Sequence, residues 1–246
     1  MAWREFFVYG LTASLQAGNG TVFSRSSIRI DSDADFEFQK TVYHATSGNI
    51  KLKYQDDSSG RYLIKTASDM RIIAGNFVGT PFIWPRPYII LAGTTFTVEA
   101  ADASTVANVL RLAFLGGKIR PGTPPWEKRF RGLVPFVYNT GLIDVAANGS
   151  MNLRIEVDND AHFLVQKLTG FKVGSCTVSI REGSRDRDWQ NQAVHFDCLF
   201  GNGQLPNVMY ANRFVYRGSV VTIDVNDLSG LANQVELSFV GVKLYE

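Results

Sequence analysis

The segment GTTFTVEAADASTVANVLRLAFLGGK (residues 93–118) decides the fold, because a close version of it occurs again as GSVVTIDVNDLSGLANQVELSFVGVK (218–243). The two segments align without a gap. Each contains two stretches in which apolar and polar residues alternate, such as TTFTVEA and VLRLAFLG in the first. A period of two predicts half-buried β-strands. The residues that recur are Ala107, Asn108, Leu112, Phe114, Gly116 and Lys118, which return as Ala232, Asn233, Leu237, Phe239, Gly241 and Lys243.

The repeat extends toward the N-terminus of each copy. Residues 48–76 align without a gap with residues 174–202, and the tripeptide FVY at 7–9 returns at 136–138. Three collinear blocks in the same order predict a tandem duplication of a unit of roughly 115 residues, a common size for one domain. The expected organisation is a first repeat over 1–119, a proline-rich linker over 120–132 and a second repeat over 133–246. Three prolines favour a stiff, exposed linker.

The fold class predicted for both repeats is all-β. Several short strands separated by turn residues, without alternation between strands and helices, indicate a β-sandwich or jelly roll. The dipeptide Asn-Gly at 19–20 and again at 148–149 is the strongest short signal for a hairpin turn. The sequence therefore predicts two tandem β-sandwich or jelly-roll-like domains.

Two acidic stretches raise the question of a metal site. Asp31, Asp33 and Asp35 alternate in IRIDSDADF (28–36), and Glu156, Asp158 and Asp160 alternate in LRIEVDNDAHF (153–163). An EF-hand loop that began at Asp31 would need Gly at its sixth position and Glu at its twelfth, but Phe36 and Val42 stand there. Two interpretations remain: a looser calcium site, or aspartates that cap a turn by bonding to their own backbone. The capping turn is the favoured one.

The composition excludes several classes of protein. The 25 basic and 23 acidic residues nearly balance, which argues against a protein made chiefly to grip nucleic acid. No apolar run is long enough for a membrane span, and the N-terminus is a poor signal peptide, so we expect synthesis in a cytoplasm. Cys176 and Cys198 align with Ile50 and Ile72, which predicts small buried apolar residues. We expect no cofactor, no metal and, in the absence of every local catalytic motif, no enzyme.

The segments that differ between the repeats are the candidate contact sites. GTPFIWPRPYII (79–90) places Trp84 and Arg86 among prolines, and this text does not recur in the second repeat. Trp and Arg are favoured at interface hot spots, although Trp84 folded over its own sandwich is an equal alternative. Trp3 in the N-terminal arm and Trp126 in the linker complete the predicted partner contacts. A carbohydrate-binding module that stacks sugars on Trp84, Trp126 and Trp189 is an alternative function, but these residues do not recur between the copies.

The repeated text at 93–118 and 218–243, G-x-x-F-x-V followed by D-x-S and AN-x-x-x-L-x-F-x-G-x-K in the first copy, resembles virion structural proteins of bacteriophages. The resemblance implies a structural, non-enzymatic protein that is located in the virion and associates with copies of itself and other virion proteins. A capsid-associated decoration, stabilising or spike-base protein is the first expectation. A duplicated jelly roll is also similar to double-jelly-roll major capsid proteins, and a tail-associated sandwich is a further alternative.

Overall fold

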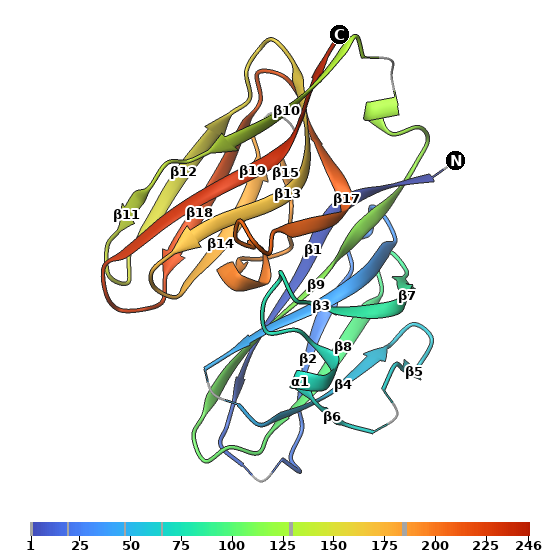
Figure 1. The fold of residues 1–246 in the computed structure, drawn as a ribbon. Coiled ribbons are helices and arrows are strands. Elements are labelled where there is room, and N and C mark those ends of the chain that lie inside the picture. Colours follow the sequence, from blue (N-terminus) through green and yellow to red (C-terminus); the bar gives the residue numbers. More distant parts are fainter. Residues whose placement is uncertain (1, 19, 47, 65, 128–129, 184–185) are drawn as a thin grey trace.

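The computed structural model describes all residues except 1, 19, 47, 65, 128–129 and 184–185 (Figure 1). The described residues form four antiparallel sheets, arranged as one sandwich in each half of the chain. The prediction of an all-β fold with two sandwiches is confirmed. Among the described residues, no helix has the length and apolarity needed to cross a membrane.

The first half is a sandwich of two sheets. One sheet has the strand order β1-β9-β3-β7, and the other has the order β2-β8-β4-β5, with β6 also paired to β4. The chain changes sheet at almost every connection, which is the winding of a jelly roll. A one-turn helix, α1 (Met70–Ile73), follows β6. The strands are β1 (Ala2–Leu15), β2 (Ser24–Arg29), β3 (Phe36–Ala45), β4 (Ile50–Asp56), β5 (Arg61–Tyr62), β6 (Ser68–Asp69), β7 (Phe82–Ile90), β8 (Thr95–Asp102) and β9 (Asn108–Pro121).

The second half has the same strand order. Its sheets are β10-β19-β13-β17, with β11 also on β19, and β12-β18-β14-β15, with β16 also on β14. The short helix η2 (Phe196–Cys198) stands where α1 stands in the first half. The strands are β10 (Gly132–Asn139), β11 (Ile143–Val145), β12 (Ser150–Glu156), β13 (His162–Lys172), β14 (Cys176–Glu182), β15 (Arg187–Asp188), β16 (Val194–His195), β17 (Asn207–Val215), β18 (Val220–Asp227) and β19 (Asn233–Tyr245).

A β-bulge at the same place in both halves explains one pair of repeated glycines. The register of β3 shifts between Phe38 and Lys40, and that of β13 shifts between Val165 and Lys167. Gly116 and Gly241 lie opposite these bulges. A Cβ on either glycine would lie 2.0 Å from the carbonyl oxygen of Glu37 or Leu164, so only glycine fits.

The inner faces of the sheets form the core of each half. Phe114 packs edge-on against Phe38, Phe96 and Tyr54 in the first half, and Phe239 stacks on Trp189 in the second. Both phenylalanines are buried, as their place in the repeat predicts. Cys176 and Cys198 are free, buried thiols, which confirms that they serve as small apolar residues.

Strand β1 is buried on both faces, and this joins the two halves. Phe7, Tyr9 and Leu11 face the core of the first half, whereas Phe6 and Val8 belong to a core that is continuous with that of the second half. In Figure 1, β1 and β9 run beside β17 at the junction. The amide of Val8 donates to the carbonyl of Trp189, and the amide of Asn191 donates to that of Val8. Because both faces of β1 are covered, its central residues are apolar without alternation.

The segment expected to be an exposed linker is exposed at 121–123, 127 and 131, but part of it packs against the second half. Strand β9 continues to Pro121, β10 begins at Gly132, and a turn of 3-10 helix, η1 (Pro125–Glu127), lies between them. Trp126 and Phe130 pack on a small cluster formed by Leu164, Phe214 and Leu244. Lys128 and Arg129 lie outside the described residues. The halves are therefore held by direct packing, and the proline-rich segment covers part of a sheet.

The predicted Asn-Gly hairpin turn is wrong for the second half. Asn148 has a φ of 53° and the amide of Gly149 donates to Ala146, so a turn is present. However, it joins β11 to β12, which lie in different sheets and do not pair with each other. Asn19 lies outside the described residues.

Candidate functional site

The acidic stretches form two matching clusters around a buried lysine. In the first half, the Nζ of Lys118 lies 2.7 Å from Asp31 Oδ2 and 2.9 Å from Asp33 Oδ1. In the second half, the Nζ of Lys243 lies 2.6 Å from Asp158 Oδ2 and 3.2 Å from Asp160 Oδ1. Each ammonium also lies over an aromatic ring from the repeated FVY, Phe7 at 4.2 Å and Phe136 at 4.4 Å.

A tyrosine hydroxyl completes each cluster. Tyr9 accepts a hydrogen bond from the amide of Asp31, and Tyr138 accepts one from the amide of Asp158 while donating to the Asp158 carboxylate. The hydrogen bond to Lys243 lowers the pKa of Asp158. Although burial opposes it, the two aspartates raise the pKa of Lys243. Each pair of aspartates thus holds a cation of the chain itself at the place where a calcium ion would otherwise bind.

These clusters also correct the alignment of the acidic stretches. Lys118 and Lys243 show that Asp31 is the counterpart of Asp158 and Asp33 that of Asp160, two residues away from the apparent match. Asp35 has a different role, because its Oδ1 accepts a hydrogen bond from the backbone amide of Ala92. The interpretation as simple caps on their own backbone is therefore incomplete, since four of the six acids hold a lysine.

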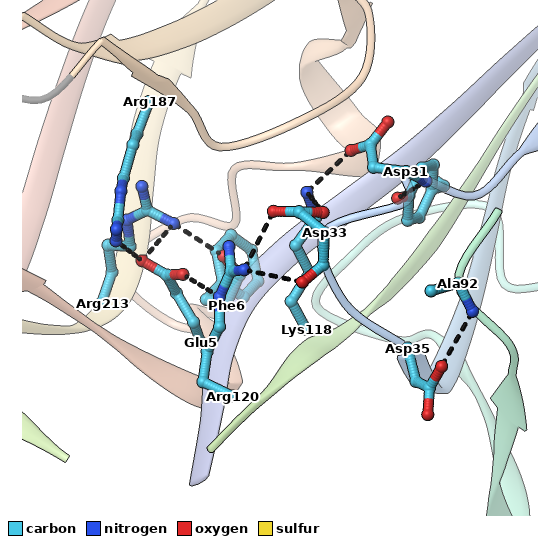
Figure 2. A network of polar contacts seen from close by, with 11 residues as sticks. Glu5, Phe6, Asp31, Asp33, Asp35, Ala92, Lys118, Arg120, Arg187 and Arg213 are labelled. Carbon is cyan, nitrogen blue, oxygen red and sulfur yellow. Dashed lines mark hydrogen bonds and ion pairs between the residues drawn. The ribbon is translucent and has the colours of Figure 1, made fainter. Parts of the chain in front are cut away.

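A buried carboxylate lies at the junction of the halves (Figure 2). Glu5, from β1, accepts from Arg120 Nε at 2.9 Å and Arg187 Nη1 at 3.2 Å, and lies 3.1 Å from Arg213 Nη1. Arg213 is 1% exposed, and its Nη1 also donates to the carbonyl of Phe6. Although burial opposes it, Arg213 and Arg120 lower the pKa of Glu5. Arg120 continues the network to Asp33 at 2.9 Å, so the junction and the first lysine cluster are connected.

A cleft of about 350 Å³ opens over this network. Its charged lining comes from both halves. Among the described residues it comprises five acids (Glu5, Asp31, Asp33, Asp186, Asp188) and four bases (Lys118, Arg120, Arg187, Arg213). Glu5, Asp31 and Asp33 bond to bases of the same cleft, as Figure 2 shows. These ion pairs tie the two halves of the chain together.

Two histidines meet at another point of the junction. The rings of His44, from β3, and His195, from β16, stack with centroids 3.5 Å apart. These two residues and Asp197 bring three potential metal ligands within 4.8 Å of one another. However, His195 Nδ1 accepts from the amide of Asp197, its Nε2 bonds to Ser175 Oγ, and Lys172 pairs with Asp197. The two imidazole rings are stacked in parallel, both nitrogens of His195 already have hydrogen-bond partners, and the Lys172 ammonium lies beside Asp197. This arrangement suits side-chain packing rather than binding of a metal ion.

The predicted contact residues lie at three places. Trp3 and Trp126 touch each other edge-on, with centroids 5.3 Å apart, beside the junction. Trp84 lies half-buried over its own core, next to Phe38, and its Nε1 donates to Thr41 Oγ1. Arg86 is exposed on β7. Trp189 is fully buried, so the expectation that it could stack on a sugar is wrong.

Glu5 and Arg213 were not among the residues singled out from the sequence. Each is a charged residue in an otherwise apolar stretch, Glu5 in REFFVYGL and Arg213 in NRFVY, and the matching position in the other half carries no charge. This pattern could have identified them. A buried charge needs a partner, so two such residues of opposite sign point to a contact.

A comparison with models of protein families gave no match, and neither did a comparison with curated protein sequences. Among solved structures, the chain is similar to the major capsid protein P2 from bacteriophage PM2, with 10% identity, 96% of this chain and 98% of that chain covered, and a TM-score of 0.29. It is also similar to N-glycanase F (PNGase F), with 11% identity, coverage of 95% and 96%, and a TM-score of 0.23. A third similar structure is the tandem CBM22-1-CBM22-2 domain of Paenibacillus barcinonensis Xyn10C, with 10% identity, coverage of 98% and 93%, and a TM-score of 0.19.

Proposed function

We propose that this chain is a non-enzymatic structural component of a bacteriophage virion, attached to the head as a capsid-associated decoration, stabilising or spike-base protein. It would be made in the cytoplasm of the host cell and would assemble with copies of itself and other virion proteins. The observation that carries the proposal is the junction: two jelly rolls share a continuous core and a buried Glu5–Arg213 contact, which makes a rigid building block. The repeated text at 93–118 and 218–243 supports the same class.

We further propose that the two halves arose by duplication, with domains over 1–119 and 133–246. The common strand order, the matching bulges and the paired lysine clusters support this proposal. Duplication fits an architectural role, because it doubles a packing unit while its two outer surfaces remain free to diverge.

The test is mass spectrometry of phage particles purified by density gradient, with isotope-labelled peptides from both halves as standards. The proposal predicts the chain in the particles at a fixed ratio to the portal protein. A ratio typical of the principal shell protein would identify the major coat instead of an attached component. Absence from purified particles would refute the proposal.

A further inference from the structure

The sheet face that is covered in the first half is largely uncovered in the second. The outer face of β1, β9 and β3 is buried under the second half through Phe6, Val8, Val42, Ala113 and Leu115. The residues at matching positions on β10, β13 and β19 are Pro135, Val137, Thr169, Ser238 and Val240, all exposed or half-exposed. Val137 is 50% exposed, and Leu133 and Phe171 extend the apolar surface. We call the surface formed by these seven residues the open face.

Strand β17 provides much of the cover on the first half. Lys40 Nζ donates to the carbonyl of Val208 at 2.6 Å, and Tyr210 hydroxyl bonds to Glu37. Ala211 sits directly against Gly117: a Cβ built on that glycine would lie 3.1 Å from the Cβ of Ala211. The internal contact is thus a β17 segment, Val208–Ala211, laid on a sheet face.

The counterpart of this segment in the first half is exposed as well. Lys40 pairs with Ile83 in β7 as Lys167 pairs with Val208 in β17, so Met209, Tyr210 and Ala211 match Trp84, Pro85 and Arg86. Ile83 is 56% exposed, and Pro85, Arg86 and Pro87 are exposed too. Within the part of the chain that the structure describes, both the open face and its matching segment are uncovered.

Building on the proposed function, we propose that copies of this chain associate by repeating the internal contact: the β7 segment Ile83–Pro87 of one copy packs on the open face of another. Lys167, exposed on β13, takes the place of Lys40 and donates to the carbonyl of Ile83 in the neighbouring copy. Trp126 and Phe130 already cover the end of the face near Leu244, and the half-buried Val242 packs against the same cluster. The contact with the neighbouring copy therefore runs from Val242 over Val240 to Val137. Burial of an exposed apolar surface of this kind favours association.

The contact is heterologous, because two different surfaces of the chain meet. Each copy therefore carries one donor segment and one acceptor face, and association continues until a ring closes or a chain of copies forms. Trp84 contributes by supporting the backbone of β7 from its own core, while Arg86 and the prolines make the contact.

Cysteine cross-linking tests the geometry directly. Since Ala211 and Gly117 correspond to Arg86 and Val242, we would prepare Arg86→Cys and Val242→Cys as separate proteins, mix them and oxidise the mixture. The native thiols are buried and do not compete. We expect a disulfide-linked dimer in the mixture and none from either variant alone. Val106→Cys, at an exposed loop position away from both surfaces, replaces Val242→Cys as the control and should give no dimer with Arg86→Cys.

Sedimentation of the unmodified protein supplies a second measurement. The wild type should associate as concentration rises, and Val137→Asp should lose the associated species, whereas Val106→Asp should keep it. A wild type that stays monomeric at every soluble concentration together with an uncross-linked mixture would overturn the inference, and so would Arg86→Cys that cross-links to itself. If the protein forms the cross-link but is absent from purified particles, the proposed function is refuted and the inference about self-association stands. If the protein is present in particles but does not form the cross-link, the inference is refuted and the proposed function stands.

Discussion

The ammonium nitrogen of Lys243 lies 2.6 Å from Oδ2 of Asp158, in a cluster that the first half reproduces around Lys118. The lysine side chain is almost fully buried, while the aspartate is half-exposed. The pair joins the last strand of the jelly roll to the turn before β13, and it explains why Lys, Asp and the FVY aromatics recur together.

Removal of this lysine should weaken the fold. Lys243→Met leaves Asp158 and Asp160 without their charged partner, and we expect the free energy of unfolding to fall by about 1.5–3 kcal/mol, the range for hydrogen bonds to charged groups. Urea denaturation measures the change. Arg154→Met, at an exposed position on β12, is the matched control and should have little effect. Equal midpoints for the two variants would show that the cluster does not contribute.

The same clusters predict indifference to calcium. Because a lysine ammonium already lies between the paired aspartates and occupies the place of a cation, neither calcium nor EDTA should shift the melting temperature of the purified protein. A ligand that binds only the native state must stabilise it. A calcium-dependent rise in melting temperature that disappears in Asp33→Asn or Asp158→Asn would contradict the assignment.

Neutralising Glu5 should destabilise the junction. In Glu5→Gln the buried Arg213 keeps its charge but loses its closest carboxylate, and breaking such a buried pair costs about 3–5 kcal/mol. Glu156→Gln, at an exposed position on β12, serves as the control in the same urea titration.

The wild type should unfold in one calorimetric transition because its halves share a core. Two separate transitions in the wild type would show that the halves are independent.

The histidine stack should make stability fall in mild acid. Burial, with further effects from His44 and Lys172, lowers the pKa of His195 to about 2. The ordinary value is about 6.5. Below that pH the unfolded chain takes up a proton that folded His195 does not, so the stability present at neutral pH declines as the pH falls. Between pH 7.5 and pH 5 this residue alone accounts for about 2 kcal/mol.

Unfolding free energies measured from pH 7.5 to pH 5 check this dependence. His195→Gln should lower stability at pH 7.5 and flatten the decline below pH 6.5, since it removes the titrating group. A slope in the variant as steep as that of the wild type would assign the decline to other residues.

Much of the fold could be predicted because the same pattern of strands and turns occurs twice in the sequence. The alternation in 93–118 and 218–243 corresponds to β8, β9, β18 and β19, and the burial of Phe114 and Phe239 follows from it. The alternation fails where the second half covers the first: Ala113 and Leu115 are buried although they point away from the inner core. The hydropathy pattern of one strand does not show whether its outer face is covered by the other half of the chain.

The candidate sites were harder to predict for a related reason. Lys118, Asp31 and Phe7 each recur visibly in the sequence, but their meeting depends on the register between β1, β9 and the turn before β3. Glu5 and Arg213 are far apart in the chain, and only the packing of the halves brings them together. Trp84 was ambiguous because a large aromatic residue serves a core and an interface equally well.

The central claim is that this rigid pair of jelly rolls is a building block of a phage particle. Electron cryomicroscopy of purified particles tests it most directly. We predict a map in which both jelly rolls of each copy are present at repeated positions, packed through β1 and β17 as in Figure 1. A map of intact particles that contains no such paired density would contradict the account.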